Sequence, residues 1–134
     1  MKHYTVVAAI IRNSGEILCV QRKPHKYDYI SLKYEFPGGK VEEGESKEDA
    51  LVREISEELE IDIDIDHEFL TVDHEYPDFR ITMHSFLCQS SDRDISLKEH
   101  VSYEWLQEKD LNKLDWAGAD IPIVYKLSAR LIHG

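Results

Sequence analysis

The sequence predicts an α/β (α+β) fold in which a mixed β-sheet packs against two main helices. Two observations lead to this class: apolar, β-rich segments recur along the chain, and two other segments carry apolar residues at helical spacing. The 134 residues are enough for one domain with a core of its own, so we expect a single domain over residues 1–134.

The first half of the chain is expected to contain a hairpin, a short strand and a helix. Residues 5–12 and 16–22 are β-rich and flank Asn13-Ser14-Gly15, which is typical of a hairpin. A polar loop follows over residues 23–33, and we expect Pro37-Gly38-Gly39 to end the short strand of residues 34–36. A capping-box pattern at residues 46–49 precedes apolar residues at helical spacing, which predicts a helix over residues 47–59.

The second half alternates strands and loops before it ends in a helix. We expect strands near residues 68–75 and 79–88 around a tight turn at Pro77-Asp78, a loop over residues 89–100, and a strand over residues 101–106. The last helix should run from about residue 121 to residue 132, with Pro122 in its first turn. Its core-facing residues are expected to be Ile123, Val124, Leu127 and Leu131.

The formal net charge is −11, and most of it lies in one segment. Residues 42–66 contain twelve acidic residues against Lys47 and Arg53, a net charge of −10, whereas residues 1–40 have a net charge of +4. So acidic a chain is a poor candidate for stable nucleic-acid binding, and no apolar run approaches the roughly 20 residues of a membrane span. Cys19 and Cys88 form no CxxC and no signal-peptide pattern is present, so we expect a cytoplasmic protein.

Three glutamates share one face of the predicted first helix. Glu54, Glu57 and Glu58 are spaced i, i+3 and i+4, and carboxylates so placed repel each other by a few tenths of a kcal/mol per pair. Hard oxygen ligands on one face suit Mg²⁺ or Mn²⁺. A solvated acidic face is the alternative that the three glutamates alone leave open.

A longer pattern around these glutamates resembles a known family. Gly39, five residues, Glu45, seven residues and then the run REISEELEI at residues 53–61 resemble the Nudix box, GX5EX7REUXEEXGU, with Glu60 in place of the glycine. Residues 34–40, 76–82 and 119–122 are similar to the MutT branch of that family. The resemblance implies the Nudix α/β/α sandwich, a mixed sheet between helices.

The resemblance also implies an enzyme, a nucleoside triphosphate pyrophosphohydrolase that requires Mg²⁺, for which Mn²⁺ could substitute. Its substrate would be a triphosphate of the CTP or dCTP type or an oxidised one such as 8-oxo-dGTP, which would make it a nucleotide-pool sanitation enzyme. Two alternatives remain: hydrolysis of another nucleoside-diphosphate compound, such as ADP-ribose or a dinucleoside polyphosphate, and a Nudix domain that binds nucleotides without cutting them. The sequence leaves the choice between monomer and homodimer open.

Residue roles follow at matching positions. The resemblance implies metal ligation by Glu54, Glu57, Glu58 and the Gly38 carbonyl, with Glu54 or Glu99 as general base and Glu99 as a further metal ligand. Glu99 is chosen because it stands six residues before Trp105, although it could be a plain surface acid. Arg53 would serve catalysis by orienting Glu45 or the ligand glutamates.

The candidate substrate contacts lie on other segments: Arg22, Glu35, Phe36, Lys40, Phe79 and Asp120. Arg22 and Lys40 would meet phosphate oxygens, although a surface salt bridge explains Arg22 nearly as well. Asp120 could accept a hydrogen bond from an exocyclic amino group of the base, or cap the last helix. Phe36, Phe79 and Trp116 could form the walls of a base pocket, or belong to the core.

Glu60 departs from the family pattern at a position that ends the helix. Glycine supplies the left-handed residue there, and a glutamate in that conformation costs roughly 1 kcal/mol. We therefore expect Glu60→Gly to raise thermal stability and to leave turnover nearly unchanged. The seven histidines show no ligand spacing, and the sequence assigns them no role.

Overall fold

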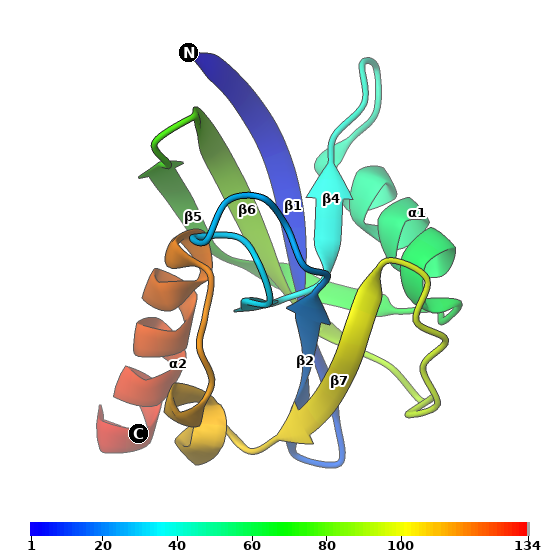
Figure 1. The fold of residues 1–134 in the computed structure, drawn as a ribbon. Helices are drawn as coiled ribbons and strands as arrows, with labels where there is room; N and C mark the ends of the chain where they lie inside the picture. The colour runs from blue at the N-terminus through cyan, green and yellow to red at the C-terminus, as the bar shows by residue number, and fades with distance from the viewer. Residues whose placement is uncertain (134) are drawn as a thin grey trace.

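The chain folds into a mixed β-sheet with helices on both faces, as the sequence predicts (Figure 1). The computed structural model describes residues 1–133, and the side chains of residues 1–129. The described strands are β1 (Lys2–Asn13), β2 (Glu16–Arg22), β3 (Tyr34–Glu35), β4 (Gly38–Lys40), β5 (Asp64–Glu75), β6 (Phe79–Gln89) and β7 (His100–Leu106). The helices are α1 (Lys47–Leu59) and α2 (Ile121–His133), with short 3-10 turns η1 (Glu108–Lys113) and η2 (Gly118–Asp120) before α2.

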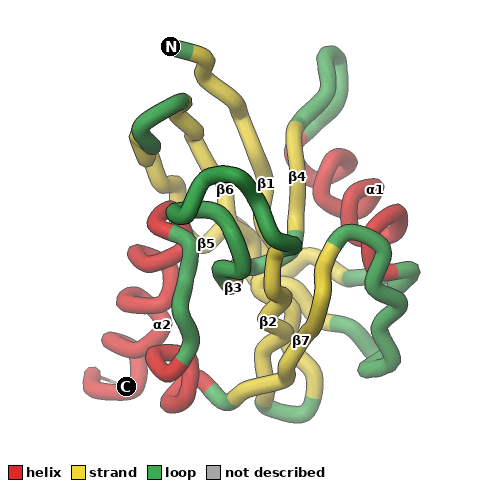
Figure 2. Tube along the Cα trace, viewed as in Figure 1, coloured by secondary structure: helices red, strands yellow, loops and turns green. Residues whose placement is uncertain are grey.

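Strand β1 runs through the middle of the sheet, whose order is β3-β2-β1-β6-β5. It pairs in parallel with β6 from Lys2, opposite Phe79, to Arg12, opposite Gln89. Its other edge is divided between β4 and β2, both antiparallel to it, and β7 pairs with β2. Figure 2 shows the loop between β2 and β3 as a green arch in front of these strands. The short strands β3 and β4 therefore lie close to the ends of β2 and β7.

Two apolar layers hold the helices on the sheet. Successive residues of β1 point to opposite faces, so that Ala8 packs in the α2 layer and Val7 in the α1 layer. Helix α1 buries Ala50, Leu51, Ile55 and Leu59, and α2 buries Ile123, Val124 and Leu127. Leu131, which was expected in the core, lies outside the residues whose side chains are described. Within the described chain no helix combines the length and hydropathy that a membrane span requires.

The predicted boundaries of α1 and of the second hairpin strand are confirmed, and the predicted hairpin exists, but its first strand is longer than the expected residues 5–12 and runs from Lys2 to Asn13. Helix α1 begins after Ser46, whose hydroxyl accepts a hydrogen bond from the Asp49 N–H at 3.0 Å. The hairpin turns at Ser14 and Gly15, which have φ of 53° and 78°, the left-handed conformation that a tight two-residue hairpin turn needs. These local signals were sufficient because turn and cap chemistry depend on adjacent residues.

The structure departs from the sequence expectations in two places. Strand β3 ends at Glu35, before Pro37 as expected, but the chain returns to the sheet at once, because Gly38 and Gly39 belong to β4 and pair with Ala8 and Val7 of β1. The reason is close packing, because a Cβ on Gly38 would stand 1.8 Å from the Val7 carbonyl oxygen. Strand β5 begins at Asp64 rather than near residue 68, since acidic residues are tolerated on an edge strand and two bulges shift its register.

Candidate active site

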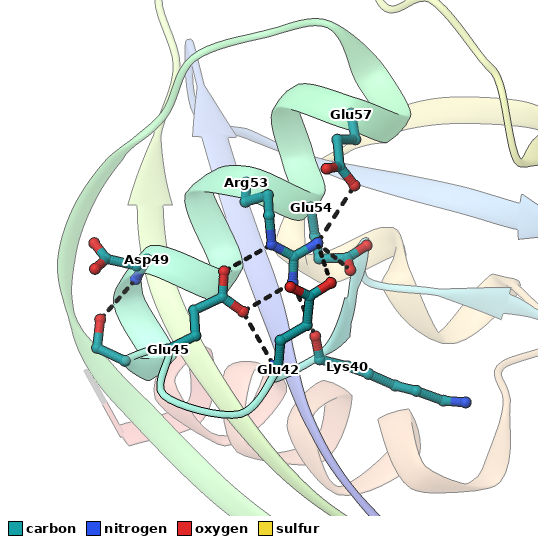
Figure 3. Close-up of polar contacts among 8 residues, drawn as sticks. Lys40, Glu42, Glu45, Asp49, Arg53, Glu54 and Glu57 are labelled. Atoms are coloured by element: carbon teal, nitrogen blue, oxygen red, sulfur yellow. Dashed lines mark hydrogen bonds and ion pairs between the residues drawn. The ribbon is translucent and has the colours of Figure 1, made fainter.

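Arg53 lies at the centre of an ion-pair cluster between α1 and the loop before it (Figure 3). Its Nε and Nη2 donate to the two carboxylate oxygens of Glu45 at 2.7 and 2.9 Å. Its Nη1 donates to Glu54 at 2.9 Å and to Glu57 at 3.3 Å. The hydrogen bonds from Arg53, followed by the Glu42 backbone N–H, lower the pKa of Glu45 to about 2. These are the contacts expected of an arginine that orients acidic side chains, and its part in catalysis stays a prediction.

Gly39 allows Glu54 to lie directly against β4. A Cβ at Gly39 would stand 2.3 Å from the carboxyl carbon of Glu54 and from one of its oxygens. Real Cβ atoms do not approach so closely, so any side chain at this position would displace Glu54. The predicted box glycine therefore has a steric reason within the site.

Glu58 is surrounded by other acidic side chains. Burial, and then the negative charges of Glu54, Glu35 and Glu99, raise its pKa to about 8. Its Oε2 is buried and has no hydrogen-bond partner among the described residues. A buried carboxylate without a donor is costly unless it binds a proton or a cation.

This environment fits a divalent cation, although the carboxylates are not yet arranged around one. The described residues contain no group of three or more His, Cys, Asp or Glu side chains ready to hold a metal ion. Glu54 and Glu57 are instead turned toward Arg53. The unpaired oxygen of Glu58 and the acidic residues around it are the hard ligands that Mg²⁺ or Mn²⁺ prefers. A bound cation would therefore compete with Arg53 for Glu54 and Glu57.

One cavity of about 670 Å³ connects these acids with an apolar region. Nine predicted site residues line it: Arg22, Glu35, Phe36, Gly38, Lys40, Glu58, Phe79, Glu99 and Asp120. The cavity lining does not include Arg53, Glu54 or Glu57. Glu54 nevertheless packs against Gly39, and Gly39 is a lining residue. Segments far apart in the sequence thus contribute to a single site.

Asp120 and Phe36 line the cavity and are joined to each other by a hydrogen bond. Asp120 is only 4% exposed, and its Oδ1 accepts a hydrogen bond from the Phe36 N–H at 3.0 Å. This bond ties η2 to the chain just after β3, which a role confined to capping α2 would not explain. Burial, followed by the charge of Glu35, raises the pKa of Asp120 well above its usual range. Reading of a base by Asp120 stays a prediction.

The aromatic residues divide into two roles. The Phe36 ring lines the cavity and stacks on Trp116 with a centroid distance of 4.6 Å. Trp116 is not a lining residue, and its Nε1 donates to the Leu111 carbonyl at 2.6 Å. Of the two alternatives left open for Trp116, the structure shows the second, because the indole is fixed in the core behind Phe36. Phe79 does line the cavity, between the rings of Tyr4 and Tyr76.

The loop before β7 brings Glu99 to the site by binding the C-terminal end of α1. The N–H groups of Ser96 and Lys98 donate to the carbonyls of Leu59 and Glu58 at 3.2 and 3.3 Å. The Lys98 ammonium lies 2.6 Å from a carboxylate oxygen of Glu60. Glu60 has φ of 55°, the left-handed conformation expected at the box glycine position, but the sequence did not predict its ion pair.

The two predicted phosphate-binding residues have different surroundings. Lys40 points away from the carboxylate cluster, and its ammonium lies 4.1 Å from the centre of the Tyr4 ring (Figure 3). Arg22 forms an ion pair with Glu35 at 3.0 Å, so the salt bridge considered from the sequence exists, but it lies in the cavity wall. Both residues reach the cavity, and phosphate binding by them stays a prediction.

His100 is the site residue that sequence reasoning missed. Its side chain is 4% exposed, and its Nε2 lies 2.8 Å from the second carboxylate oxygen of Glu35. Its position directly after Glu99 was an available signal, but the contact depends on the pairing of His100 with Arg22 across β2 and β7. That pairing joins residues 78 positions apart and could not be read from spacing.

Known proteins resemble this chain over nearly its whole length. A family model described as the NUDIX domain matches residues 1–127. The 8-oxo-dGTP diphosphatase of Escherichia coli (strain K12) is 34% identical over 127 residues, 95% of this chain and 98% of that protein. The CTP pyrophosphohydrolase of the same organism is 36% identical over 124 residues, 92% of this chain and 90% of that protein.

Solved structures agree with these sequence matches. The solution structure of the MutT protein (family Nudix hydrolase) from methicillin-resistant Staphylococcus aureus 252 is 41% identical, with a TM-score of 0.76 over 97% of this chain and 99% of that one. A crystal structure of a MutT protein from Methanosarcina mazei Go1 has a TM-score of 0.85 at 23% identity, covering 96% and 95% of the two chains. The sandwich predicted from the sequence is therefore confirmed.

Proposed function

Because this chain belongs to the Nudix family, we propose that it hydrolyses nucleoside triphosphates to the monophosphate and pyrophosphate. Nudix hydrolases generally use a divalent metal, and we propose Mg²⁺, with Mn²⁺ as a substitute. The relatives named 8-oxo-dGTP diphosphatase and CTP pyrophosphohydrolase suggest two substrate types, oxidised purine and cytosine triphosphates.

One observation carries this proposal: a single cavity is lined both by acidic residues and by apolar and aromatic ones. Glu58 and Glu99 are among the acidic lining residues, and Phe36 and Phe79 are among the aromatic ones. A nucleoside triphosphate needs both kinds of lining residue. Its phosphates need cations, which acidic side chains can hold, and its base needs an apolar wall with a few polar groups. The volume of about 670 Å³ suits a ligand of nucleotide size.

The acidic residues would perform the hydrolysis. A metal held by Glu54, Glu57, Glu58, Glu99 and the Gly38 carbonyl would lower the pKa of a water and offset phosphate charge. The oxygen of a water molecule would attack one of the two phosphorus atoms that the α–β bridging oxygen joins, and the bond from that phosphorus to the bridging oxygen would break. The bridging oxygen would leave with the other phosphate, and a carboxylate of Glu54 or Glu99 would accept the water proton. Arg22 and Lys40 would contact phosphate oxygens.

Asp120 and Glu35 would contact the base. An ionised carboxylate only accepts hydrogen bonds, so its natural partner is an exocyclic amino group such as those of cytosine and guanine. The raised pKa of Asp120 favours its protonated form, which can also donate a hydrogen bond to the base. Phe36 would supply an apolar surface beside that group, backed by Trp116.

We further propose that the protein acts in the cytoplasm and forms no stable complex with nucleic acid. Cys19 and Cys88 are both free and buried, which is compatible with a reducing compartment. The net charge of −11 disfavours a nucleic-acid backbone, whereas one nucleotide with its cations enters only the cavity.

A substrate panel tests this function. Purified protein is incubated with CTP, dCTP, 8-oxo-dGTP, dGTP, ADP-ribose and a dinucleoside polyphosphate, each with Mg²⁺, with Mn²⁺ and with a chelator. We expect monophosphate and pyrophosphate from at least one triphosphate, and loss of turnover in the chelator. Glu57→Gln should reduce turnover at least 100-fold, whereas Glu43→Gln, at an exposed acid outside the cluster, should not change it. Turnover of no triphosphate, or full activity of Glu57→Gln, would refute the proposal.

A further inference from the structure

The structure contains a buried histidine that the proposed chemistry does not use. We propose that His100 is a positioning residue, which holds the Glu35 carboxylate in the wall of the cavity and so sets the affinity for the nucleotide base. This inference rests on the proposed function, because it assumes that the cavity binds a nucleotide.

The contacts of Glu35 join three strands: Glu35 lies on β3, and its two side-chain partners lie on β2 and β7. Its Oε2 lies 2.8 Å from His100 Nε2 on β7, and its Oε1 accepts a hydrogen bond from Arg22 Nη1 on β2 at 3.0 Å. Glu35 itself pairs with Val20 across β3 and β2. Arg22 and His100 are cross-strand partners, and the register of the ladder shifts between Gln21 and Arg22. A bulge of this kind re-aims side chains, which explains how both donors reach one carboxylate.

The hydrogen bond fixes the orientation of both side chains. An ionised carboxylate is only an acceptor, so the shared proton belongs to His100 Nε2. The imidazole Nδ1 is buried and has no partner among the described residues, so Glu35 is the one hydrogen-bond partner of this ring within the part of the chain that the structure describes. Each oxygen of Glu35 has two acceptor sites, of which Arg22 and His100 occupy one each. Glu35 is thus held in place and can still accept a hydrogen bond from a ligand.

Glu35 lies within electrostatic reach of both Glu58 and Asp120. Its charge contributes to the raised pKa of each of these two side chains. Glu35, Asp120 and Glu58 all line the same cavity. A rotation of the Glu35 carboxylate would therefore change the acceptors offered to a base while the carboxylates on α1 remain in place.

Two substitutions separate this role from simple space filling. His100→Leu removes the donor from a buried position, whereas His100→Gln retains an amide N–H at about the distance of Nε2. The readouts are binding of CMP and of 8-oxo-dGMP by calorimetry without any divalent cation, kcat and KM with Mg²⁺, and thermal unfolding. The monophosphates test the base site without the hydrolytic chemistry.

We expect His100→Leu to weaken binding of the preferred monophosphate about tenfold, the effect of losing one hydrogen bond to a charged group. KM should rise by a similar factor with kcat within threefold, because Glu99 and the carboxylates on α1 remain in place. His100→Gln should stay within threefold of the wild type in binding. In a Glu35→Gln background, His100→Leu should change binding less than twofold, since its partner is already altered.

Other results would overturn the inference. Equal losses from His100→Leu in the wild-type and Glu35→Gln backgrounds would show that His100 does not act through Glu35. A fall in kcat at unchanged KM would place its effect on the neighbouring Glu99 instead. If His100→Leu does not fold, His100→Asn, whose amide is too short to reach Glu35, replaces it. A wild-type protein that cleaves no triphosphate but binds a monophosphate in a His100-dependent way would refute the proposed function and leave this role standing.

Discussion

The substitution Gly39→Ala tests whether the position of Glu54 matters for turnover. A Cβ at residue 39 would stand 2.3 Å from the Glu54 carboxyl carbon and 2.3 Å and 2.8 Å from its two oxygens. The end of a glutamate side chain can rotate away, so the overlap is relieved without moving the backbone. An alanine in a strand also restricts the unfolded chain, which contributes about 0.4–1 kcal/mol of stability. We therefore expect the melting temperature to change by no more than a few degrees.

Turnover should respond much more strongly than stability. Displacement of a reacting or metal-binding group by about 1 Å can reduce a rate about 100-fold. We expect Gly39→Ala to lower kcat by about that factor in a pyrophosphate-release assay with the preferred triphosphate, while monophosphate binding without metal is nearly unchanged.

Gly38→Ala is the matched control at the neighbouring residue. Here the Cβ would stand 1.8 Å from the Val7 carbonyl oxygen and 2.9 Å from Ala8 Cα, both backbone atoms. Relief requires separation of β4 from β1, which we place at about 3 kcal/mol or more, the upper range for overpacking. For a domain of this size that is a fall of about 12 °C in melting temperature. The reasoning is refuted if Gly38→Ala melts within 3 °C of the wild type, or if Gly39→Ala keeps wild-type kcat.

Two further predictions concern acidic residues on α1 and at its end. The pKa of Glu58 is raised in the folded state, so the folded protein keeps a proton that the unfolded chain loses as pH rises from about 4.5 to about 8, and stability falls across that window. In a chelator, Glu58→Gln should therefore gain melting temperature relative to the wild type from pH 5 to pH 8, and a difference that does not depend on pH would contradict the raised pKa. Glu60→Gly removes the conformational cost of a glutamate in the left-handed region, but it also removes the ion pair with Lys98. In 1 M NaCl that ion pair is screened, so its loss matters less there. Its gain in melting temperature should be larger in 1 M NaCl than in 50 mM NaCl, and an equal gain at both would show that the ion pair contributes nothing.

Local chemistry explains why so much of the fold could be predicted. The serine cap of α1, its apolar spacing and the Asn13-Ser14-Gly15 turn act over a few residues, and the structure confirms each of them. The glycines of β4 could not be assigned in this way. Their extended conformation depends on contact with β1, where the Val7 carbonyl excludes any side chain at Gly38. Sequence reasoning treats glycine as a breaker unless that neighbour is known.

The same distinction between local and long-range contacts separates the parts of the candidate site that could be predicted from those that could not. Glu54, Glu57 and Glu58 lie on one helix, so their shared face followed from spacing. Glu35 and His100 meet only because β3 and β7 both pair with β2, and the bulge beside Arg22 has no sequence signal. The ion pair of Glu60 with Lys98 is a long-range contact of the same kind. The sequence could not decide between pocket wall and core for Trp116, because an aromatic residue that lines a pocket and one that packs behind its wall have the same sequence pattern.

The distribution of charge explains why the acidic segment does not repel a polyphosphate outright. Arg53 already binds Glu45, Glu54 and Glu57, and the raised pKa of Glu58 means that this side chain holds a proton at neutral pH when no cation is bound. A divalent cation would displace that proton and draw Glu54 and Glu57 from Arg53, so its binding should release protons and become tighter as pH rises. A triphosphate in the cavity would then meet the metal charge beside the acidic residues, and Arg22 and Lys40 from the positively charged first 40 residues. Affinity for the triphosphate should therefore depend on the cation, whereas affinity for the base, which we propose that Glu35 and Asp120 contact, should depend on it much less.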